Sequence, residues 1–264
     1  MYGNYDGENG SPEFDLFLGG NIWSTVKLNE TSIVVTKEVV YLSQSENIYV
    51  CLGNKGKGSP FMSILELRFL GNDNTTYESP NGVLFFSRRW DFSSLPDSHV
   101  RYGEDVFDRI WVSRNFDYCR EINTTLPVMS DNNSYNLSSL VMSTAITPRN
   151  TTQSIIMKLE GSDPTVRYFA YMHFAEVEDL SLRPNETREF EIRMKGVSIA
   201  NFTPKYLQTD TFVLHPESET NIEFSLVRTP KSTLPPIINA LEIYIANSSR
   251  NLSLTKRMMT RLRV

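Results

Sequence analysis

Short segments in which apolar and polar residues alternate recur along nearly the whole chain. In EFEIRMK (189–195), Phe190, Ile192 and Met194 fall on one face of an extended strand and charged residues fall on the other. Gly, Pro, Asn and Asp separate such segments, and no stretch shows sustained helical periodicity. Many short strands of this kind predict an all-β protein built as a β-sandwich. The other predicted strands are EFDLFL (13–18), SIVVTKEVVYL (32–42), NIYVCL (47–52), ILELRFL (64–70), SIIMKLE (154–160), VRYFAYMHFAEV (166–177), TFVLH (211–215), IEFSLV (222–227) and ALEIYI (240–245).

Two pairs of segments repeat at one common spacing. PFMSILEL (60–67) resembles PIINALEI (236–243), and EFDLFL resembles EFEIRM (189–194), with both pairs 176 positions apart. A shared spacing indicates a duplicated domain. We therefore expect the C-terminal half of a first copy at 1–82, a complete second copy at 83–247, and a basic, disordered tail at 248–264.

Composition narrows the classes of function. The net charge of −5 argues against nucleic acid as a partner. No apolar run approaches the ~18 residues of a membrane-spanning helix. The first residues have neither the basic nor the apolar region of a signal peptide. No metal-ligand or cofactor motif occurs, so we expect neither metal nor cofactor.

Asparagine sequons point to the secretory pathway. N-x-[ST] occurs at 11 of the 21 asparagines, where chance predicts about four. Such an excess favours an extracellular, glycosylated chain over one that is merely rich in Asn, Ser and Thr. The sequon at Asn9 is set aside because Pro12 follows its Ser. The expected sites are Asn29, Asn74, Asn123, Asn132, Asn136, Asn150, Asn185, Asn201, Asn247 and Asn251.

The two cysteines, Cys51 and Cys119, lie in different copies of the repeat. In an oxidising compartment they could form a disulfide with each other, or the partner of Cys51 could lie in a missing front half of the first copy. The sequence leaves both alternatives open.

The motifs together resemble one known family. The segments PEFDLFLGGNIWSTV, YVCLGNKGKGSPFMSILELR, RYGEDVFDRIW, RYFAYMHFAEVE, REFEIRMKG and LPPIINALEIYI resemble the tandem malectin-like ectodomain of plant leucine-rich-repeat receptor-like kinases. The resemblance covers about residues 1–247 in the family's order. It implies a jelly-roll type malectin-like β-sandwich on the extracellular side of the plasma membrane.

The resemblance also implies a function. A cell-wall glycan or an extracellular peptide or protein is the expected ligand, with a co-receptor as a further partner. The chain has no kinase motifs, no leucine-rich repeats and no membrane segment. We therefore expect a non-enzymatic fragment of a receptor. A truncated, non-functional product is an alternative.

RYGEDVFDRIW (101–111) carries the best candidates for chemistry. Glu104 and Asp108 could serve a carbohydrate-active hydrolase as paired carboxylates. The competing interpretation is structural: Arg101 and Arg109 pair with Glu104, Asp105 or Asp108 near Trp90. Val106 and Ile110, four positions apart, then anchor the segment to the core with Phe107 or Trp111. GNKGKGS (53–59) fails the phosphate-loop pattern and predicts a hairpin loop. The candidate sugar-stacking aromatics are Tyr102, Trp111, Tyr118, Tyr168 and Tyr171.

Overall fold

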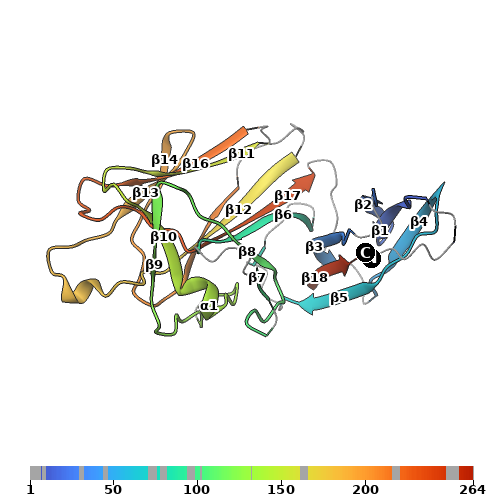
Figure 1. Cartoon of the computed structure of the whole chain (residues 1–264), viewed down its shortest axis with the longest axis horizontal. Helices are drawn as coiled ribbons and strands as arrows, with labels where there is room; N and C mark the ends of the chain where they lie inside the picture. The colour runs from blue at the N-terminus through green and yellow to red at the C-terminus, as the bar shows by residue number, and fades with distance from the viewer. Residues whose placement is uncertain are drawn as a thin grey trace. The chain divides into compact units, whose positions relative to one another are not determined.

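The computed structural model consists almost wholly of strands (Figure 1), which confirms the all-β prediction. It describes residues 7, 10–29, 33–43, 47–70, 76–77, 82–93, 99–101, 103–131, 133–160, 166–215, 221–247 and 256–263. The chain divides into two compact units, which we call unit 1 (Met1–Phe86 with Arg250–Val264) and unit 2 (Ser87–Ser249). The division falls within strand β6 (Val83–Asp91), a few residues after the predicted limit.

Unit 1 contains two antiparallel groups of strands. Strand β1 (Glu13–Leu18) lies between β2 (Asn21–Lys27) and β4 (Val50–Lys57). In the second group, β3 (Thr36–Ser43) pairs with the start of β6, and β18 (Lys256–Arg263) lies between β3 and β5 (Ile64–Phe69). Alternate residues of β1 are buried, as its period of two requires. They join a core of Phe14, Leu16, Leu18, Trp23, Val26, Leu28, Val39 and Tyr41.

Two predictions for unit 1 are wrong. The segment 248–264 was expected to be disordered, but residues 256–263 form β18, because two neighbouring strands supply partners for its main chain. The segment 53–59 was expected to be a hairpin loop, but residues 53–57 continue β4 alongside β1. Gly56 and Gly58 have positive φ values of 76° and 74°. The chain therefore turns near residues 56–58, where β4 ends, and not at residue 53, where the predicted loop begins.

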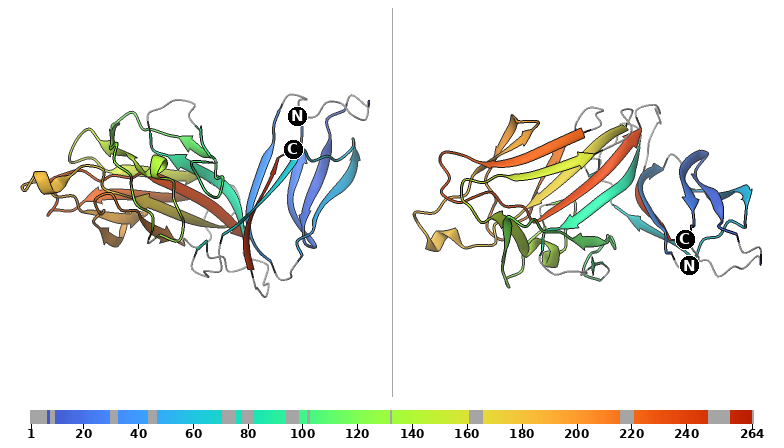
Figure 2. Two further views of the ribbon diagram at one scale, coloured as in Figure 1. Left: turned by 90° about the horizontal axis from the view of Figure 1, so that it is seen from below. Right: turned by 45° about the horizontal axis from the view of Figure 1, so that its top comes forward.

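Unit 2 is a sandwich of two larger sheets (Figure 2). The first sheet has the order β11 (Ile155–Glu160), β16 (Asn221–Arg228), β13 (Phe190–Met194), β14 (Val197–Phe202). The second has the order β15 (Asp210–Leu214), β12 (Val166–Phe174), β17 (Ala240–Asn247), β6. The shorter elements are β7 (His99–Val100), β8 (Trp111–Ser113), β9 (Cys119–Asn123), α1 (Ser139–Met142), β10 (Thr144–Pro148) and the 3-10 helix η1 (Leu180–Leu182).

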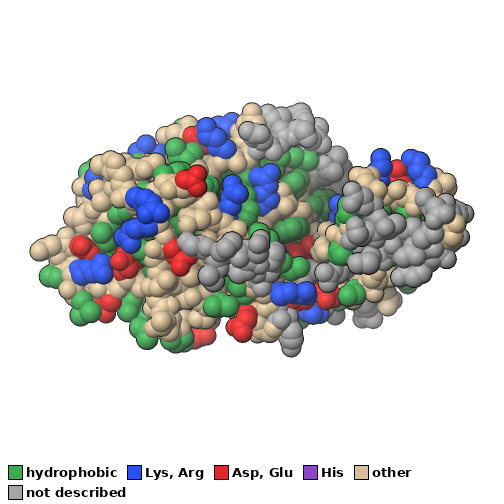
Figure 3. All heavy atoms as spheres, viewed as in Figure 1, with side chains coloured by type: hydrophobic (Ala, Val, Ile, Leu, Met, Phe, Trp, Pro, Cys, Tyr) green, Lys and Arg blue, Asp and Glu red, His purple; other side chains and the backbone are tan. Residues whose placement is uncertain are grey.

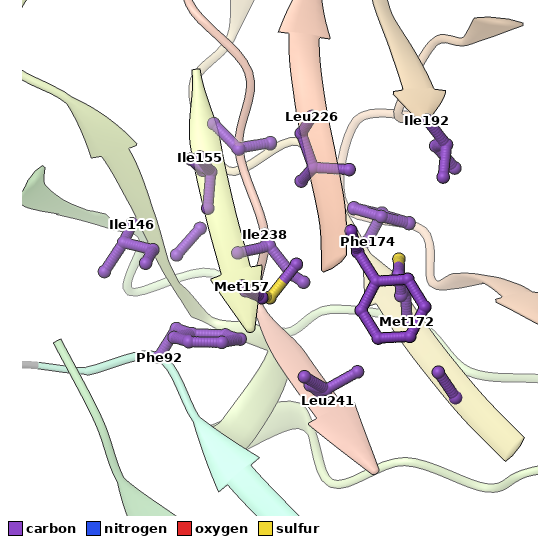
Figure 4. Close-up of a cluster of buried hydrophobic side chains, with 14 of the residues drawn as sticks. Phe92, Ile146, Ile155, Met157, Met172, Phe174, Ile192, Leu226, Ile238 and Leu241 are labelled. Carbon is purple, nitrogen blue, oxygen red and sulfur yellow. The ribbon is translucent and has the colours of Figure 1, made fainter. Parts of the chain in front are cut away.

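The core of unit 2 lies between these two sheets. Met157 of β11 and Leu226 of β16 come from one sheet, and Met172 of β12 and Leu241 of β17 come from the other (Figure 4). All four are at most 1% exposed. Burial of apolar side chains contributed by both sheets is what holds a sandwich together.

The segments that repeat in the sequence form strands with the same pairing in both units. Hairpin β1–β2 corresponds to hairpin β13–β14, and β4 and β16 each pair with the first strand of these hairpins. Phe14 faces Val26 in one hairpin, and Phe190 faces Phe202, 176 positions later, in the other. A register shift follows at the equivalent place in both hairpins. Such agreement extends the likeness of the two copies from sequence to backbone geometry.

Candidate functional site

The segment 101–111 folds as consecutive turns. The carbonyl oxygen of Arg101 accepts hydrogen bonds from the backbone N–H groups of Glu104 (2.8 Å) and Asp105 (3.0 Å). The N–H of Asp108 donates to the carbonyl of Asp105 (2.9 Å), and Asp108 has a φ of 54°. A left-handed residue interrupts helical geometry, so these turns do not continue as a helix beyond Asp108.

Asp105 is completely buried at the centre of this segment. Its carboxylate accepts from the Nε of Arg109 at 2.9 and 3.1 Å, and from the indole N–H of Trp111 at 2.8 Å. The backbone N–H groups of Phe107 and Arg109 also donate to it, at 3.0 and 3.2 Å. Both carboxylate oxygens are therefore occupied by donors from its own chain segment.

Arg109 links this segment to β17. Its Nη1 lies 3.4 Å from Oε1 of Glu242, and its Nη2 donates to the carbonyl oxygen of Asn136 at 2.9 Å. The Nε of Arg89, on β6, donates to the other oxygen of Glu242 at 2.8 Å. Arg89 Nη2 and the hydroxyl of Tyr244 are also in contact, at 2.6 Å. One buried glutamate thus holds two buried arginines from different parts of unit 2.

His173 of β12 completes the group. Its Nε2 lies 3.3 Å from Glu242 Oε1, and its Nδ1 lies 2.9 Å from the hydroxyl of Thr211. Burial lowers the pKa of His173, and the charges of Arg109 and Arg89 lower it further, against the opposing effect of Glu242. The imidazole is therefore neutral at physiological pH. With Nε2–H donating to Glu242, Nδ1 accepts from Thr211.

Asp105, Arg109, Arg89, Glu242 and His173 form what we call the buried charge cluster. Burial alone would raise the pKa of Glu242, but Arg89, the hydrogen bond of His173 and Arg109 together hold it well below its usual range. Two carboxylates then balance two guanidinium groups, and all four side chains are 0% exposed. These charged groups are paired with one another and shielded from water, an arrangement in which removing one partner would leave an uncompensated buried charge.

Glu104 and Asp108, the carboxylate pair of the hydrolase hypothesis, have different surroundings. Asp108 is buried, and its oxygens lie 3.1 and 3.2 Å from the guanidinium of Arg101. Glu104 is exposed. Among the described residues no three His, Cys, Asp or Glu side chains gather as metal ligands. The two arginine pairings predicted for 101–111 are therefore present, but a cleft lined by both carboxylates is not.

The apolar anchors of this segment are only part of those predicted. Val106 is 59% exposed and Ile110 is only half-buried. Phe107 and Trp111, the other predicted anchors, are buried, and the guanidinium of Arg109 lies 5.3 Å from the centre of each ring. Aromatic rings on both sides of a buried arginine stabilise its charge. The turn at Asp108 shifts the residue spacing, so the helical spacing of Val106 and Ile110 has no structural meaning.

Most predicted sugar-stacking aromatics are inaccessible. Trp111 and Tyr171 are 0% exposed and Tyr168 is 6% exposed, so none presents a ring face to a ligand. These three assignments are wrong because aromatic residues on strands of a sandwich fill its interior. Tyr102 lies outside the described residues. Tyr118 is half-buried and remains a candidate.

Tyr118 belongs to a line of aromatic side chains at the edge of the core. Its ring stacks on Phe116, with centroids 5.6 Å apart and an interplanar angle of 12°. Phe116 lies 6.0 Å from buried Phe92, and Phe92 lies 6.2 Å from Trp90. We call Trp90, Phe92, Phe116 and Tyr118 the aromatic row. Trp90, Phe116 and Tyr118 are half-buried, so parts of their rings face solvent.

Two exposed arginines flank the aromatic row. The guanidinium carbons of Arg88 and Arg114 lie 5.9 and 5.8 Å from the ring of Trp90. Partly exposed aromatic rings with adjacent arginines have the composition of protein-recognition surfaces. On the face shown in Figure 3, basic and acidic side chains are interspersed. Such mixing gives no basic stripe for nucleic acid on that face, among the residues described.

The expected modification sites divide by exposure. Asn29, Asn123, Asn136, Asn150, Asn185 and Asn201 are all exposed. Asn74, Asn132 and Asn251 lie outside the described residues, as does the side chain of Asn247. Both cysteines are free thiols, Cys51 exposed and Cys119 buried, so the structure contains no disulfide between them. Burial raises the pKa of Cys119 to about 12, which makes that thiol a poor nucleophile.

Comparison with known proteins decides the family. The family model described as Malectin-like domain matches residues 1–246. This chain belongs to the malectin-like domain family. It is 77% identical over 249 residues to a protein of Arabidopsis thaliana described as Probable LRR receptor-like serine/threonine-protein kinase. That match covers 94% of this chain and 29% of the kinase, so the malectin-like chain spans under a third of its relative.

Solved structures agree on the malectin-like fold. The ANXUR1 extracellular domain from Arabidopsis thaliana gives a TM-score of 0.60 at 12% identity, covering 93% of this chain and 75% of that one. A complex of the plant peptide RALF23 with FER and LLG2 contains a chain that gives a TM-score of 0.59 at 14% identity, with 94% and 77% covered. At these identities the likeness establishes the fold. The resemblance to receptor-like kinase ectodomains is thus confirmed.

Sequence reasoning missed three members of the buried charge cluster. Arg89, Glu242 and His173 were not assigned to such a cluster from the sequence. One signal was available: Glu242 interrupts the apolar strand ALEIYI, and an acid in such a strand needs a buried cationic partner. Nothing in the sequence identifies Arg89 as that partner, because 153 positions separate them.

Proposed function

We propose that this malectin-like chain recognises an extracellular peptide or protein ligand as part of a receptor-like kinase, without chemistry of its own. The observation that carries the proposal is its similarity over 94% of its length to a receptor-like kinase. A neighbour of the same fold is in a complex with a plant peptide and LLG2. By analogy, a co-receptor is a further expected partner.

The aromatic row is the proposed recognition surface. Its half-buried rings provide apolar contact area, and Arg88 and Arg114 provide donors for carboxylates or carbonyl groups of a ligand. A cell-wall glycan is the second candidate, because sugar rings also stack on aromatic faces. The two arginines beside one indole favour an acidic peptide or protein over a neutral glycan.

Binding by the secreted chain tests this surface. The chain would be immobilised and exposed to fractionated extracellular plant peptides and proteins, and separately to cell-wall oligosaccharides. We expect saturable binding of a peptide or protein, weakened about tenfold or more in an Arg88→Ala, Arg114→Ala double variant. An Arg183→Ala variant is the matched control, because Arg183 is exposed but directly follows η1, outside the aromatic row.

Three outcomes would overturn parts of this proposal. Equal binding by the double variant and the control would exclude the aromatic row as the surface. Binding of oligosaccharides alone would replace the peptide by a glycan. Hydrolysis of the oligosaccharides, abolished by Glu104→Gln, would establish the enzyme that Asp108 and its arginine pairing argue against.

An extracellular location has its own test. All six sequons whose side chains the structure describes are exposed, which supports modification in the secretory pathway. Peptide mapping of the chain secreted from plant cells should find glycans at several of these six positions. Their absence from all six would contradict the extracellular location. Within the described ranges, no helix has the length and apolarity to cross a bilayer.

A further inference from the structure

The two units build their second sheets from different parts of the chain. In unit 2, β12 lies between β15 and β17 and is antiparallel to both. The counterparts of β15 and β17, 176 positions earlier, are β3 and β5. In unit 1, the strand between β3 and β5 is β18, again antiparallel to both neighbours. Residues 256–263 therefore occupy the place that residues 166–174 occupy in unit 2.

The correspondence holds at the level of register. Ala170 of β12 faces Leu214 and Ile243, whose counterparts in unit 1 are Glu38 and Leu67. In unit 1, Glu38 faces position 261 and Leu67 faces position 260. The two registers thus agree to within one residue. This agreement would be unexpected if β18 were merely lying against an available edge.

Charge also matches across this strand. Arg261 faces Glu38 on β3 and Glu66 on β5 in the backbone register. Opposite charges directly across a strand pair stabilise that register. Arg263 faces Thr36 and Ile64, which are uncharged. At Arg261, opposite charge on both neighbouring strands favours the observed register of β18, in addition to the main-chain pairing.

We propose that the slot between β3 and β5 is a strand-acceptor site, and that residues 256–263 are a replaceable occupant of it. Main-chain hydrogen bonds to both neighbours provide the affinity, as in recognition by β-strand addition. In the backbone register a basic residue, Arg261, is opposite acidic residues on both neighbouring strands, which favours this alignment. The site binds an extended basic segment of the sequence KRMMTRLR, supplied by the same chain or by a separate peptide.

Strand β5 depends most on this occupant. Among the described strands its only partner is β18, whereas β3 also pairs with β6. Emptying the slot would leave the main chain of β5 unpaired and would expose one edge of β3. Backbone amides of β5 should therefore respond more strongly than those of β3 when β18 is removed.

Hydrogen exchange on the full chain tests the proposal. Thr260→Pro removes an N–H donor in the middle of β18, where the strand has neighbours on both sides. We expect the amides of β5, and then of β3, to exchange about tenfold or more faster, while β13 and β16 in unit 2 stay unchanged. Arg250→Pro, outside the strand, is the control and should leave β5 and β3 protected.

A labelled peptide with the sequence of residues 254–264 distinguishes an acceptor site from simple destabilisation. It should bind the Thr260→Pro variant saturably and restore protection in β5 and β3. Binding to the parent chain should be about tenfold weaker or more, because the tethered strand competes at a high effective concentration. A scrambled peptide of the same composition controls for the attraction between a basic peptide and an acidic chain.

The proposal fails if exchange in β5 is unchanged in Thr260→Pro, or if the peptide restores no protection. Equal binding of the native and scrambled peptides would also overturn it. A charge comparison covers the case in which Thr260→Pro unfolds unit 1. Arg261→Glu in the full chain should accelerate exchange in β5, and Arg263→Glu should do so much less. Equal effects of the two substitutions would contradict the assigned register.

Discussion

Units 1 and 2 show the same strand arrangement stabilised in two ways. In unit 2 the strands follow one another between residues 87 and 247, and a large core lies between two sheets. In unit 1 the core is smaller and one central strand comes from residues 256–263. Backbone pairing places few demands on side chains, so a distant segment can fill the place of a local one. The same strand position can thus be filled by segments from different places in the chain.

The units also differ in where their charges lie. In unit 1, Lys55 and Lys57 pair with Glu13 and Asp15 on the surface, at 2.9 to 3.6 Å. In unit 2, the buried charge cluster is shielded from water. Surface pairs contribute little to stability, whereas removing one partner of a buried pair leaves an uncompensated charge. Unit 2 should therefore be far more sensitive to single charge changes.

Separating the units should give the largest effect. Residues 83–249 contain all of the core and charge cluster of unit 2, so we expect them to fold alone and cooperatively. Residues 1–86 lack β18 and should remain largely unfolded. Near-ultraviolet circular dichroism and amide exchange of each fragment would measure this. A folded 1–86 fragment would show that unit 1 does not need a strand from 256–263.

Core truncations should act on one unit at a time. Leu16 in unit 1 and Leu241 in unit 2 are at most 1% exposed, so replacing either by Ala should cost about 2–5 kcal/mol of unfolding free energy. Amide exchange in β1 and in β13 reports the two units separately. Loss of protection in β13 on Leu16→Ala would show that the units unfold together.

Asp91 should make the stability of unit 2 depend on pH. Burial raises its pKa to about 7, against hydrogen bonds from Thr144 and Ser93. Between about pH 4 and pH 7 the folded state then binds a proton that the unfolded state has released, so stability falls as pH rises, by up to about 4 kcal/mol. Asp91→Asn should remove this loss in urea unfolding measured from pH 4 to pH 8.

His173 makes the stability of unit 2 depend on pH in the opposite direction. The effect of Asp91 must therefore be measured by comparing the parent chain with Asp91→Asn. Its lowered pKa means that the unfolded state binds the extra proton, so His173 favours unfolding as pH falls below about 6.5. Only the difference between the parent chain and Asp91→Asn isolates the carboxyl. A parallel pH dependence in both would contradict the burial of an ionisable Asp91.

A surface pair of unit 1 should give the smallest effect. Lys57 and Lys55 lower the pKa of Glu13 by hydrogen bonding and charge. Because this pair is open to solvent, Glu13→Gln should change the unfolding midpoint of unit 1 only slightly, and 1 M salt should abolish the difference. A large effect that persists in salt would show that β1 relies on this contact.

The sequence predicted the strands better than their partners. EFDLFL coincides with β1 because Phe14, Leu16 and Leu18 recur at every second position and form one fully apolar face. The segment GNKGKGS was misassigned because glycines usually end strands, yet pairing with β1 extends β4 through 53–57. KRMMTRLR was interpreted as a basic, disordered tail, and nothing in its own sequence names β3 and β5 as its partners.

The candidate site shows the same limit. Asp105 and Arg109 were expected to form structural pairs, since acids and bases are close in the sequence. Their burial depends on Glu242, on a strand more than 130 positions away. Trp111 and Tyr171 could be taken for ligand-binding aromatics because sequence does not state which face of a strand is covered. Long-range packing decides both questions.

The unfolding free energy of unit 2 in two neighbouring variants tests the central claim, that the acids of 101–111 serve structure. Asp105→Asn removes the buried charge opposite Arg109, and Glu104→Gln changes an exposed neighbour. Urea unfolding followed by tryptophan fluorescence should show a loss of about 3 kcal/mol or more for Asp105→Asn. For Glu104→Gln the change should stay within about 0.5 kcal/mol. Equal and small effects of both substitutions would contradict the structural role of the cluster.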